Sequence, residues 1–488
     1  MASIRVTTTT AEDKGPGRGG GGEGLRQPLL HEAPPPATAA SDVPVVTEAR
    51  LQRRSLLAAG THLSKTILGV AILALPRVFS LLGLGTATIW LVFVAGLTYL
   101  SISFLAKATA RDVVREQLGV AAQAVLDLAV IVNGFGMMVI MLVVAGDILV
   151  GTPSDDSGSN AFADGLSKRG GKGGSEGGLL APECGDRATV LGVVTVLLLA
   201  PLVSGTRART TTGASALGVV AILLWAGITL LLFLVALSNG QLHTMHWWPH
   251  SSTFTSKGFE SAVQMVGILP IFTVAFLCQT SLGHTMRDLQ YVAESEVDRM
   301  AVVALSLCSA AFLLISVCSY GLFGAKELHP DILSNFTVQA LEAFVWTRLA
   351  QACFLLVRLA FLVSLLASFP LMMFPFRDSL WKLLFRQPLQ GPGLWLVTYL
   401  ALGGAYWAAA YLTSIWEPLI LIGSTAGILI AFVFPGLLAA SLEQDLLTEG
   451  ASTRRTRGIM GSLLMLVGLV IGVAGLARVA FYKDPIAD

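Results

Sequence analysis

The residue whose chemistry stands out is Lys65, a lysine inside an apolar stretch that runs from Ser55 to Leu82. Lys65 lies ten residues after Ser55, which is about 15 Å of helical rise and about half of a ~30 Å hydrocarbon layer. A charge at that depth usually faces a bundle interior or a cavity. Gly69 and Pro76 follow, and both weaken a continuous helix. A broken span with a buried charge indicates a binding site; the alternative is a kinked packing helix whose Lys65 snorkels to the nearer surface.

A second interrupted stretch lies at 258–286. Pro270 stands in its middle, and the segment Ala-Phe-Leu-Cys-Gln-Thr-Ser-Leu-Gly at 275–283 is polar for a membrane centre. Broken apolar segments in corresponding positions of two halves are the best sequence indication of a transporter site built on inverted repeats. Spans one to five would form one repeat and spans six to ten the other, with the eleventh outside.

The elements that would position these residues are membrane spans. Of the 488 residues, 54% are hydrophobic and 13% charged, whereas soluble domains carry about 25% charged residues. The composition predicts an all-α, polytopic membrane protein in the lipid bilayer, and the net charge of +1 gives no indication of a nucleic-acid partner. We expect eleven spans, at 55–82, 85–106, 121–150, 188–206, 214–238, 258–286, 299–324, 346–376, 393–412, 415–441 and 458–482.

The orientation follows from Lys and Arg in short loops, which favour the cytosolic side. Basic clusters recur in every second loop if the N-terminus is inside. We expect a disordered cytosolic tail at 1–54, a transporter domain at 55–482 with a flexible Gly/Ser-rich outer loop at 151–187, and a short C-terminal tail at 483–488 on the opposite side. The tail shows no cleavable signal peptide, and its Leu29-Leu30 pair is either part of a sorting signal or incidental.

An ordered set of motifs along residues 55–480 resembles the amino acid/auxin permease superfamily, also called the amino acid transporter transmembrane family. It is most like plant-type vacuolar amino acid exporters and sodium-coupled neutral amino acid transporters. No single motif is decisive, but the ordered set is specific. The segments are Thr-Ile-Leu-Gly-Val-Ala-Ile-Leu-Ala-Leu-Pro at 66–76, then 132–134, 145–149, 275–278, 320–324, 331–336, 358–360, 369–370, 374–377, 415–416, 423–426 and 434–435.

The resemblance implies a leucine-transporter-type fold, a 5+5 inverted repeat plus one helix, and amino acid transport. It also implies where the substrate binds. The substrate carboxylate would be held by main-chain N–H groups around Leu68, Gly69, Val70 and Ala71. The amino group would be held by main-chain carbonyls around Ala275, Phe276 and Cys278. Asn133 in the third span either lines the path or bonds a neighbouring helix.

Three positions depart from the pattern of this family. A second glycine often stands at the position of Ala71, and a histidine is common at the position of Gln279. In the sodium-coupled members an asparagine stands at the position of Lys65 and helps to bind sodium, together with a hydroxyl of the eighth span. Ser368 matches that hydroxyl, and Ser364 lies one turn earlier. A fixed ammonium group there would repel Na⁺ and could occupy its position.

These residues predict a secondary active transporter of amino acids, neutral ones expected, that is proton-coupled or uncoupled rather than sodium-coupled. Because burial disfavours a charged ammonium group, Lys65 could load and release a proton; if a partner holds it charged, transport becomes uniport or exchange. We expect no cofactor and no metal, and a vacuolar or other endomembrane location. His62, one turn before Lys65, either shares its proton path or lies near the inner mouth.

Other interpretations stay open. An amino acid sensor that signals through the tail is an alternative to a transporter. An enzyme is not expected, because the spans hold no paired carboxylates, metal-ligand spacing or nucleophile motif. The histidines 243, 246 and 250 beside two tryptophans indicate an interfacial belt or a metal site. Arg358 would pair with Asp147 or Glu417 or snorkel outward, while Ser424 and Thr425 would pack helices or touch substrate.

Overall fold

The structure is a computed structural model. It describes residues 59–108, 112–152, 176–177, 179, 187–204, 211–249, 258–282, 294–385, 392–412, 414–441 and 451–482. The expected tails at 1–54 and 483–488, most of the loop at 151–187 and the Leu29-Leu30 pair lie outside these residues, so the expectations for them remain predictions.

The described chain is helical apart from two short strands, β1 (Gly151–Thr152) and β2 (Glu176–Gly177), which pair antiparallel. In that part of the chain, ten segments are long and apolar enough to cross a membrane. They match the second to eleventh expected spans in order, and the first expected span is present as a broken helix. About eleven spans are thus confirmed.

The spans after the first are the following elements: α3 (Leu84–Ala108); α4 (Asp112–Val150); α6 (Arg187–Val194), η3 (Thr195–Leu199) and α7 (Ala200–Ser204); α8 (Thr211–Ser238); α9 (Phe259–Val266) and α10 (Pro270–Ala275); α12 (Glu294–Glu327); α14 (Thr347–Phe385); α15 (Pro392–Tyr411); α16 (Trp416–Ile422), η6 (Gly423–Gly427), η7 (Leu429–Val433) and α17 (Phe434–Ser441); and α18 (Ala451–Phe481). Two short elements, η5 (Ile332–Ser334) and α13 (Val338–Glu342), lie between α12 and α14.

The first span breaks just after Lys65. Residues 59–67 are helical, Leu68 and Gly69 are not, and the chain continues as the 3₁₀ turn η1 (Val70–Leu73) and then α2 (Leu75–Leu82). Gly69 is extended, with φ −93° and ψ −161°. Pro76 lies in the first turn of α2, where its missing N–H group would have had no partner within the helix. The break is therefore made at Leu68–Gly69, and Pro76 helps to start the next helix.

The sixth span is broken too. Helix α10 begins at Pro270 and ends at Ala275, residues 276–278 are not helical, and residues 279–282 are helical again. The freed N–H group of Cys278 donates to Oε1 of Gln279 (3.0 Å), whose Nε2 donates to Oγ of Ser101 on α3 (3.2 Å). Both breaks thus fall where the sequence predicts them.

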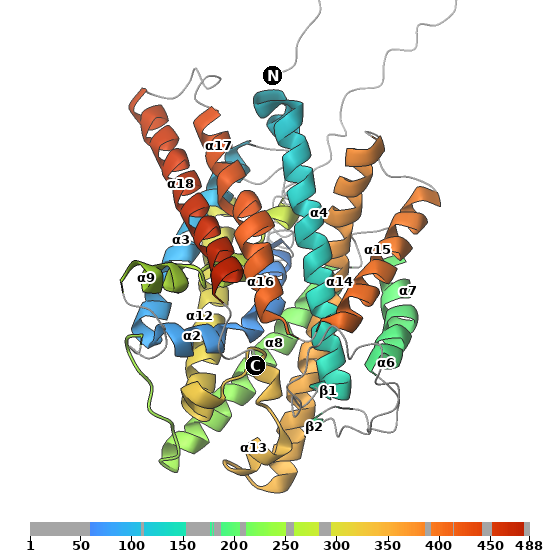
Figure 1. The fold of residues 1–488 in the computed structure, drawn as a ribbon, viewed down its shortest axis with the longest axis vertical. Coiled ribbons are helices and arrows are strands. Elements are labelled where there is room, and N and C mark those ends of the chain that lie inside the picture. The colour runs from blue at the N-terminus through green and yellow to red at the C-terminus, as the bar shows by residue number, and fades with distance from the viewer. Residues whose placement is uncertain are drawn as a thin grey trace, which may run out of the picture. The chain divides into compact units, whose positions relative to one another are not determined.

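Helix α14 packs along both α4 and α8, and α12 packs against α2, α3 and α8 (Figure 1). Helices α17 and α18 lie side by side. Trp225 of α8 joins these packings, since its ring makes edge contacts with Phe361 of α14 (5.5 Å) and Phe336 (6.5 Å). Such aromatic pairs contribute about 0.5–1.5 kcal/mol each beyond their buried area. They fix α8 against α14 and against the segment between η5 and α13.

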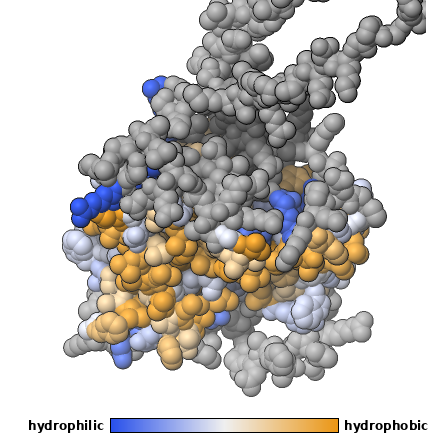
Figure 2. Space-filling model, turned by 90° about the horizontal axis from the view of Figure 1, so that it is seen from above, coloured by the Kyte–Doolittle hydropathy of each residue, from blue (hydrophilic) through white to orange (hydrophobic). Residues whose placement is uncertain are grey.

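The outer surface of the helices is apolar. Large hydrophobic side chains are exposed on α3, α8, α15 and α18, among them Ile89, Leu223, Leu400 and Val473. Figure 2 shows hydrophobic residues gathered in a broad band on the face it presents. Exposed apolar patches of this extent mark contact with lipid or protein, and with helices of this length they fit a bilayer.

The segment at 241–249, which carries two of the three histidines, is a packed strap. The main-chain oxygens of His246 and Trp247 accept from the N–H groups of Leu84 (2.8 Å) and Gly85 (2.9 Å), and the N–H group of His243 donates to the oxygen of Gly321 (2.9 Å). Among the described residues no group of three metal-binding side chains occurs, and His250 lies outside them. This strap holds the turn between α2 and α3 against the end of α12.

Gly83 at this turn supplies a test of that packing. Its φ is +77°, and a Cβ atom there would lie 2.6 Å from the main-chain carbon of Trp248. With ψ 156°, Gly83 adopts a conformation that is essentially restricted to glycine. We therefore expect Gly83→Ala to lower the free energy of unfolding by about 1–3 kcal/mol from the backbone conformation alone, and further through the clash. Thermal unfolding in detergent measures it. Gly96→Ala on α3 is the control, because no atom lies within 4 Å of a Cβ atom there; equal effects of the two changes would contradict this account.

Candidate functional site

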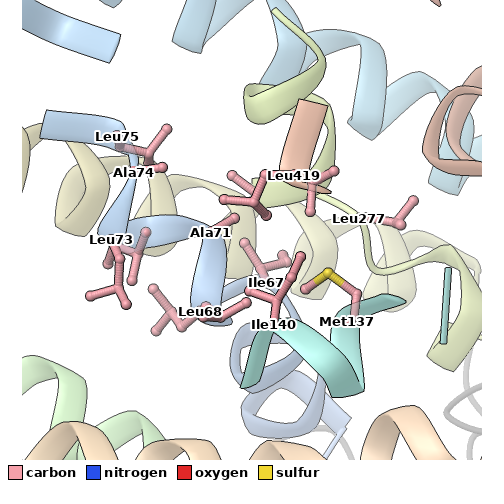
Figure 3. Packing of buried hydrophobic residues seen from close by; sticks show 14 of the residues in the cluster. Ile67, Leu68, Ala71, Leu73, Ala74, Leu75, Met137, Ile140, Leu277 and Leu419 are labelled. Atoms are coloured by element: carbon pink, nitrogen blue, oxygen red, sulfur yellow. The ribbon is translucent and has the colours of Figure 1, made fainter. Parts of the chain in front are cut away.

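A cavity lies at the first-span break, where the first, third, sixth and eighth spans meet. Figure 3 shows the turn of the first span, with Leu68 and Ala71, at the left, and Met137 of α4 and Leu277 to its right. The cavity is lined by Lys65, Thr66, Gly69, Ala71, Asn133, Met137, Met141, Val274, Leu277, Ser368, Leu371 and Met372. Apart from Lys65 its wall carries no charged side chain among the described residues.

Lys65 is completely buried. Its Nζ donates to the main-chain oxygen of Leu68 (3.1 Å) and to Oγ of Ser364 on α14 (2.8 Å). No salt bridge to Lys65 occurs within the described part of the chain. Ser368 lines the cavity, but its Oγ donates to the oxygen of Ser364 in its own helix (3.0 Å). Of the two predicted hydroxyls, Ser364 is therefore the one that contacts Lys65.

Only two of the four residues predicted to bind the substrate carboxylate line the cavity. Gly69 and Ala71 line the cavity, whereas Leu68 and Val70 are fully buried and lie off its wall. The first N–H groups of a short helix have no partner within the helix, so the start of η1 presents main-chain donors next to the cavity.

Asn133 of α4 carries an unsatisfied acceptor at the cavity. Its side chain is 2% exposed, and its Oδ1 has no hydrogen-bond partner. A buried amide oxygen left without a partner costs about 1–3 kcal/mol. The next residue, Gly134, allows close approach of α14, since a Cβ atom there would lie 3.0 Å from Cβ of Phe376. Close packing of α4 on α14 therefore keeps the Asn133 acceptor beside the cavity.

The predicted amino-group site at Ala275, Phe276 and Cys278 lies beside the cavity, behind Val274 and Leu277, which line it. The ring of Phe276 packs edge-on against Phe312 (5.3 Å). The oxygen of Cys278 accepts from the N–H group (3.1 Å) and Oγ (3.0 Å) of Ser281.

Two polar residues that we did not single out, Thr66 and Ser281, join the two breaks. Oγ of Ser281 donates to Oγ1 of Thr66 (3.1 Å), and Thr66 also lines the cavity. Their polar side chains within apolar spans were the sequence signal that could have identified them as candidate site residues.

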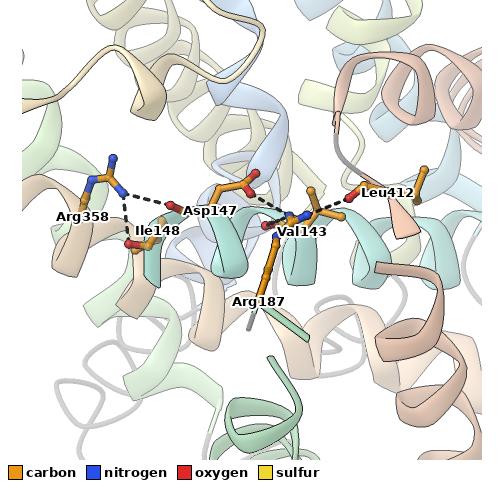
Figure 4. A network of polar contacts seen from close by, with 6 residues as sticks. All are labelled: Val143, Asp147, Ile148, Arg187, Arg358 and Leu412. Atoms are coloured by element: carbon orange, nitrogen blue, oxygen red, sulfur yellow. Dashed lines mark hydrogen bonds and ion pairs between the residues drawn. The ribbon is translucent and has the colours of Figure 1, made fainter. Parts of the chain in front are cut away.

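A polar network lies at the end of α4 (Figure 4). Arg187 at the start of α6 forms an ion pair with Asp147 (2.7 Å) and donates to the oxygens of Val143 (3.1 Å) and Leu412 (3.2 Å). Arg358 of α14 donates to the main-chain oxygens of Asp147 and Ile148 (3.1 Å each). Of the alternatives left open for Arg358, the structure shows the contact with Asp147. The guanidinium group bonds the main-chain oxygen of Asp147 rather than its carboxylate.

The contacts of Arg187 and Arg358 tie the third, fourth, eighth and ninth spans together at one end. Arg187 was not predicted from the sequence as the partner of Asp147, because Arg187 stands at the edge of a long loop.

Asp331 lies next to this network, outside the spans. Its Oδ1 accepts from the N–H group of Leu333 (2.9 Å), whose oxygen accepts from Arg358 (3.5 Å). Burial raises the pKa of Asp331 to about 6, although the Leu333 N–H group and the Arg358 guanidinium both act to lower it.

The remaining candidates have local roles. Ser424 and Thr425 donate to oxygens of their own helix, those of Ile420 (2.6 Å) and Leu421 (2.7 Å). A Cβ atom at Gly475 of α18 would overlap Oγ of Ser424, so Ser424 lies at a close helix contact. His62 is half-buried, and its oxygen accepts from Oγ1 of Thr66 (3.0 Å).

The family model described as transmembrane amino acid transporter protein matches residues 52–480. The chain belongs to this family of transmembrane amino acid transporters. It is 26% identical over 437 residues to amino acid transporter AVT6A of Arabidopsis thaliana, with 87% of each chain covered. It is 24% identical over 441 residues to vacuolar amino acid transporter 5 of Schizosaccharomyces pombe, with 86% of this chain and 94% of that one covered.

The match to solute carrier family 38 member 10 of Rattus norvegicus is 23% identical and covers 78% of this chain but 32% of that protein. Among solved structures, a mutant of the Eremococcus coleocola manganese transporter is similar with a TM-score of 0.56, at 12% identity and with 90% of both chains covered. At that identity the likeness concerns the fold alone, and it agrees with the expected leucine-transporter-type arrangement of this transporter family member.

The two serines of α14 allow a matched test of the Lys65 contact. Hydrogen bonds to charged groups contribute about 1.5–3 kcal/mol, against about 1 kcal/mol for a neutral one. We expect Ser364→Ala to lower the free energy of unfolding more than Ser368→Ala does, because only Ser364 accepts from the buried ammonium. Thermal unfolding of both variants in the same detergent measures the difference. Equal losses would show that Lys65 does not depend on Ser364.

Proposed function

We propose that this family member is a sodium-independent, proton-coupled secondary active transporter of neutral amino acids. The observation that carries the proposal is the position of the Lys65 ammonium group at the first-span break. It is bonded to one main-chain oxygen and one hydroxyl.

Those two partners are the kind that a hard cation takes, since such ions prefer oxygen ligands from carbonyls, hydroxyls and carboxylates. An ammonium group already bound to these oxygens occupies the space of a cation and repels a second positive charge. In sodium-coupled proteins that resemble this chain, the corresponding place holds the ion. The geometry therefore supports transport that does not use Na⁺.

Coupling to protons, rather than uncoupled transport, is supported by the burial of Lys65. Its ammonium group is fully enclosed and lacks a carboxylate partner among the described residues. Release of the proton removes a charge from apolar surroundings, where charge is costly. Alternating access would expose this nitrogen first to one side and then to the other, so that it carries a proton with each cycle.

The cavity wall supports a neutral substrate. The main-chain N–H groups of Val70 and Ala71 at the start of η1 suit a carboxylate, whereas that of Gly69 already donates to the oxygen of Ile67 (2.7 Å). The unsatisfied Oδ1 of Asn133 suits an amino group. Besides Lys65 and the hydroxyl residues Thr66 and Ser368, the remaining wall is apolar and is formed by Met137, Met141, Val274, Leu277, Leu371 and Met372. These flexible and polarizable side chains accommodate apolar substituents of varied shape, and the wall offers no counter-charge for an acidic or basic substrate side chain besides Lys65.

The proposed location rests on the membrane spans and on the similarity to vacuolar amino acid transporter 5 of Schizosaccharomyces pombe. We propose a vacuolar or other endomembrane location, with the tail at 1–54 in the cytosol and the C-terminus on the opposite side. The sides proposed for the two ends of the chain follow from the basic clusters that recur in alternate loops.

Coupling is tested in proteoliposomes with imposed ion gradients. We expect wild-type uptake to follow a pH gradient and to be indifferent to Na⁺. Lys65→Ala should lose the drive by the pH gradient, because the proton carrier is gone, and Lys65→Asn should gain some stimulation by Na⁺. Lys382→Ala is the control, since Lys382 lies outside the cavity and pairs with Asp378 at 3.3 Å. Wild-type uptake that follows a Na⁺ gradient and ignores pH would refute the role of Lys65.

The role of Asn133 is tested by Asn133→Leu. The change removes an acceptor that has no partner in the protein, so we expect the Tm to be kept or raised. The KM for a neutral amino acid should rise about tenfold, which corresponds to ~1.4 kcal/mol, the size of one hydrogen bond to a charged amino group. Met137→Leu, a nearly isosteric change in the same wall, is the control. An unchanged KM for Asn133→Leu would remove Asn133 from the substrate site.

A further inference from the structure

The side chain of Lys65 passes directly over a glycine of α8. A Cβ atom at Gly218 would overlap Cε of Lys65, and it would lie 2.8 Å from Cδ of Lys65 and 3.2 Å from Cβ of Ala367 on α14. Real Cβ atoms essentially never approach other heavy atoms closer than 3.0 Å. Gly227 on the same helix has no atom within 4 Å of such a Cβ position. Gly218 therefore leaves the space through which Lys65 reaches its two oxygen partners.

A methyl group at this position has few ways to be accommodated. Helix α8 is held against α14 by the Trp225–Phe361 contact and by Ala367 near Gly218. Lys65 is the flexible member of the contact, and it is completely buried, so it must shift within the packed interior. The displacement therefore falls on Lys65, whose Nζ moves away from the Leu68 oxygen and Ser364 Oγ.

We propose that Gly218 is a positioning residue for coupling, which admits the Lys65 ammonium group to the cation position. The inference rests on the proposed function of Lys65 and adds a second determinant, 153 positions away in the chain. The choice of coupling ion then depends on a pair of residues: a lysine long enough to reach the oxygens, and a glycine small enough to let it pass.

The alternative role of Gly218 is helix packing without regard to Lys65. The two roles differ in a double-variant comparison, because Lys65→Ala removes the Cδ and Cε atoms with which a Cβ at Gly218 would clash. If the contact with Lys65 is what matters, Gly218→Ala is harmful beside Lys65 and harmless in the Lys65→Ala background. If general packing matters, the change is equally harmful in both.

The experiment compares wild type, Gly218→Ala, Lys65→Ala and the double variant, with Gly227→Ala as the matched control on α8. Each is measured for Tm in detergent and for amino acid uptake in proteoliposomes under pH and Na⁺ gradients. We expect Gly218→Ala alone to lower the Tm and to lose stimulation by the pH gradient. In the Lys65→Ala background it should change neither, and Gly227→Ala should behave as wild type.

The outcomes separate the two proposals. Equal Tm losses from Gly218→Ala in both backgrounds, or full retention of the pH profile by Gly218→Ala alone, would overturn the role of Gly218. Retention of proton drive by Lys65→Ala would overturn the proposed function instead. In that case the Tm comparison still reports whether Gly218 and Lys65 are in contact.

Discussion

Main-chain groups freed at a helix break must find partners inside the membrane, because no water is available in the hydrocarbon layer. The two breaks solve this with side chains from their own segments. Lys65 donates to the freed oxygen of Leu68, and Gln279 accepts from the freed N–H group of Cys278. These are two of the positions noted in the sequence as departures from the pattern of the family. One of these two residues, Lys65, also lines the cavity and is the residue to which we assign the coupling role.

The C-terminal end of α4 shows the same principle, in which side chains supply partners for main-chain groups that the helix leaves unpaired. The last oxygens of a helix lack partners within it, and they attract positive charge. Arg358 donates to the oxygens of Asp147 and Ile148, which are among these last oxygens. Arg187 donates to the Asp147 carboxylate and to the oxygen of Val143, one turn further inside the helix. Because these arginines come from α14 and α6, the end of α4 is fastened to helices on both of its sides. Helix α4 thus carries Asn133 between two sets of fixed contacts, one at this network and one at the close approach of Gly134 to α14.

The fold by itself leaves the transported substance open. The solved structures with a similar fold include a manganese transporter at 12% identity, while the family match is to amino acid transporters. The same arrangement of helices hosts different sites. In this chain the described cavity wall holds methionines, leucines, a valine, an alanine, a glycine, a threonine, a serine, an asparagine and one lysine. The proposed substrate, a small zwitterion with an uncharged side chain, fits this set better than a divalent metal does, because such a metal takes carboxylate or imidazole ligands.

The sequence alone determined the spans, their order and both breaks, because hydrophobic length and the placement of Gly69, Pro270 and the polar run after Ala275 are local properties. It also placed Lys65 near the hydroxyls of the eighth span, through a resemblance rather than through geometry. Only the tertiary structure decided that Ser364 rather than Ser368 accepts from Lys65, that Arg187 takes the Asp147 carboxylate, and that Gly218 lies under the lysine. The physical reason is helix rotation: α8 and α14 are apolar on nearly every face, so their sequences carry no signal for which side faces a partner. That side is set by packing against helices far away in the chain.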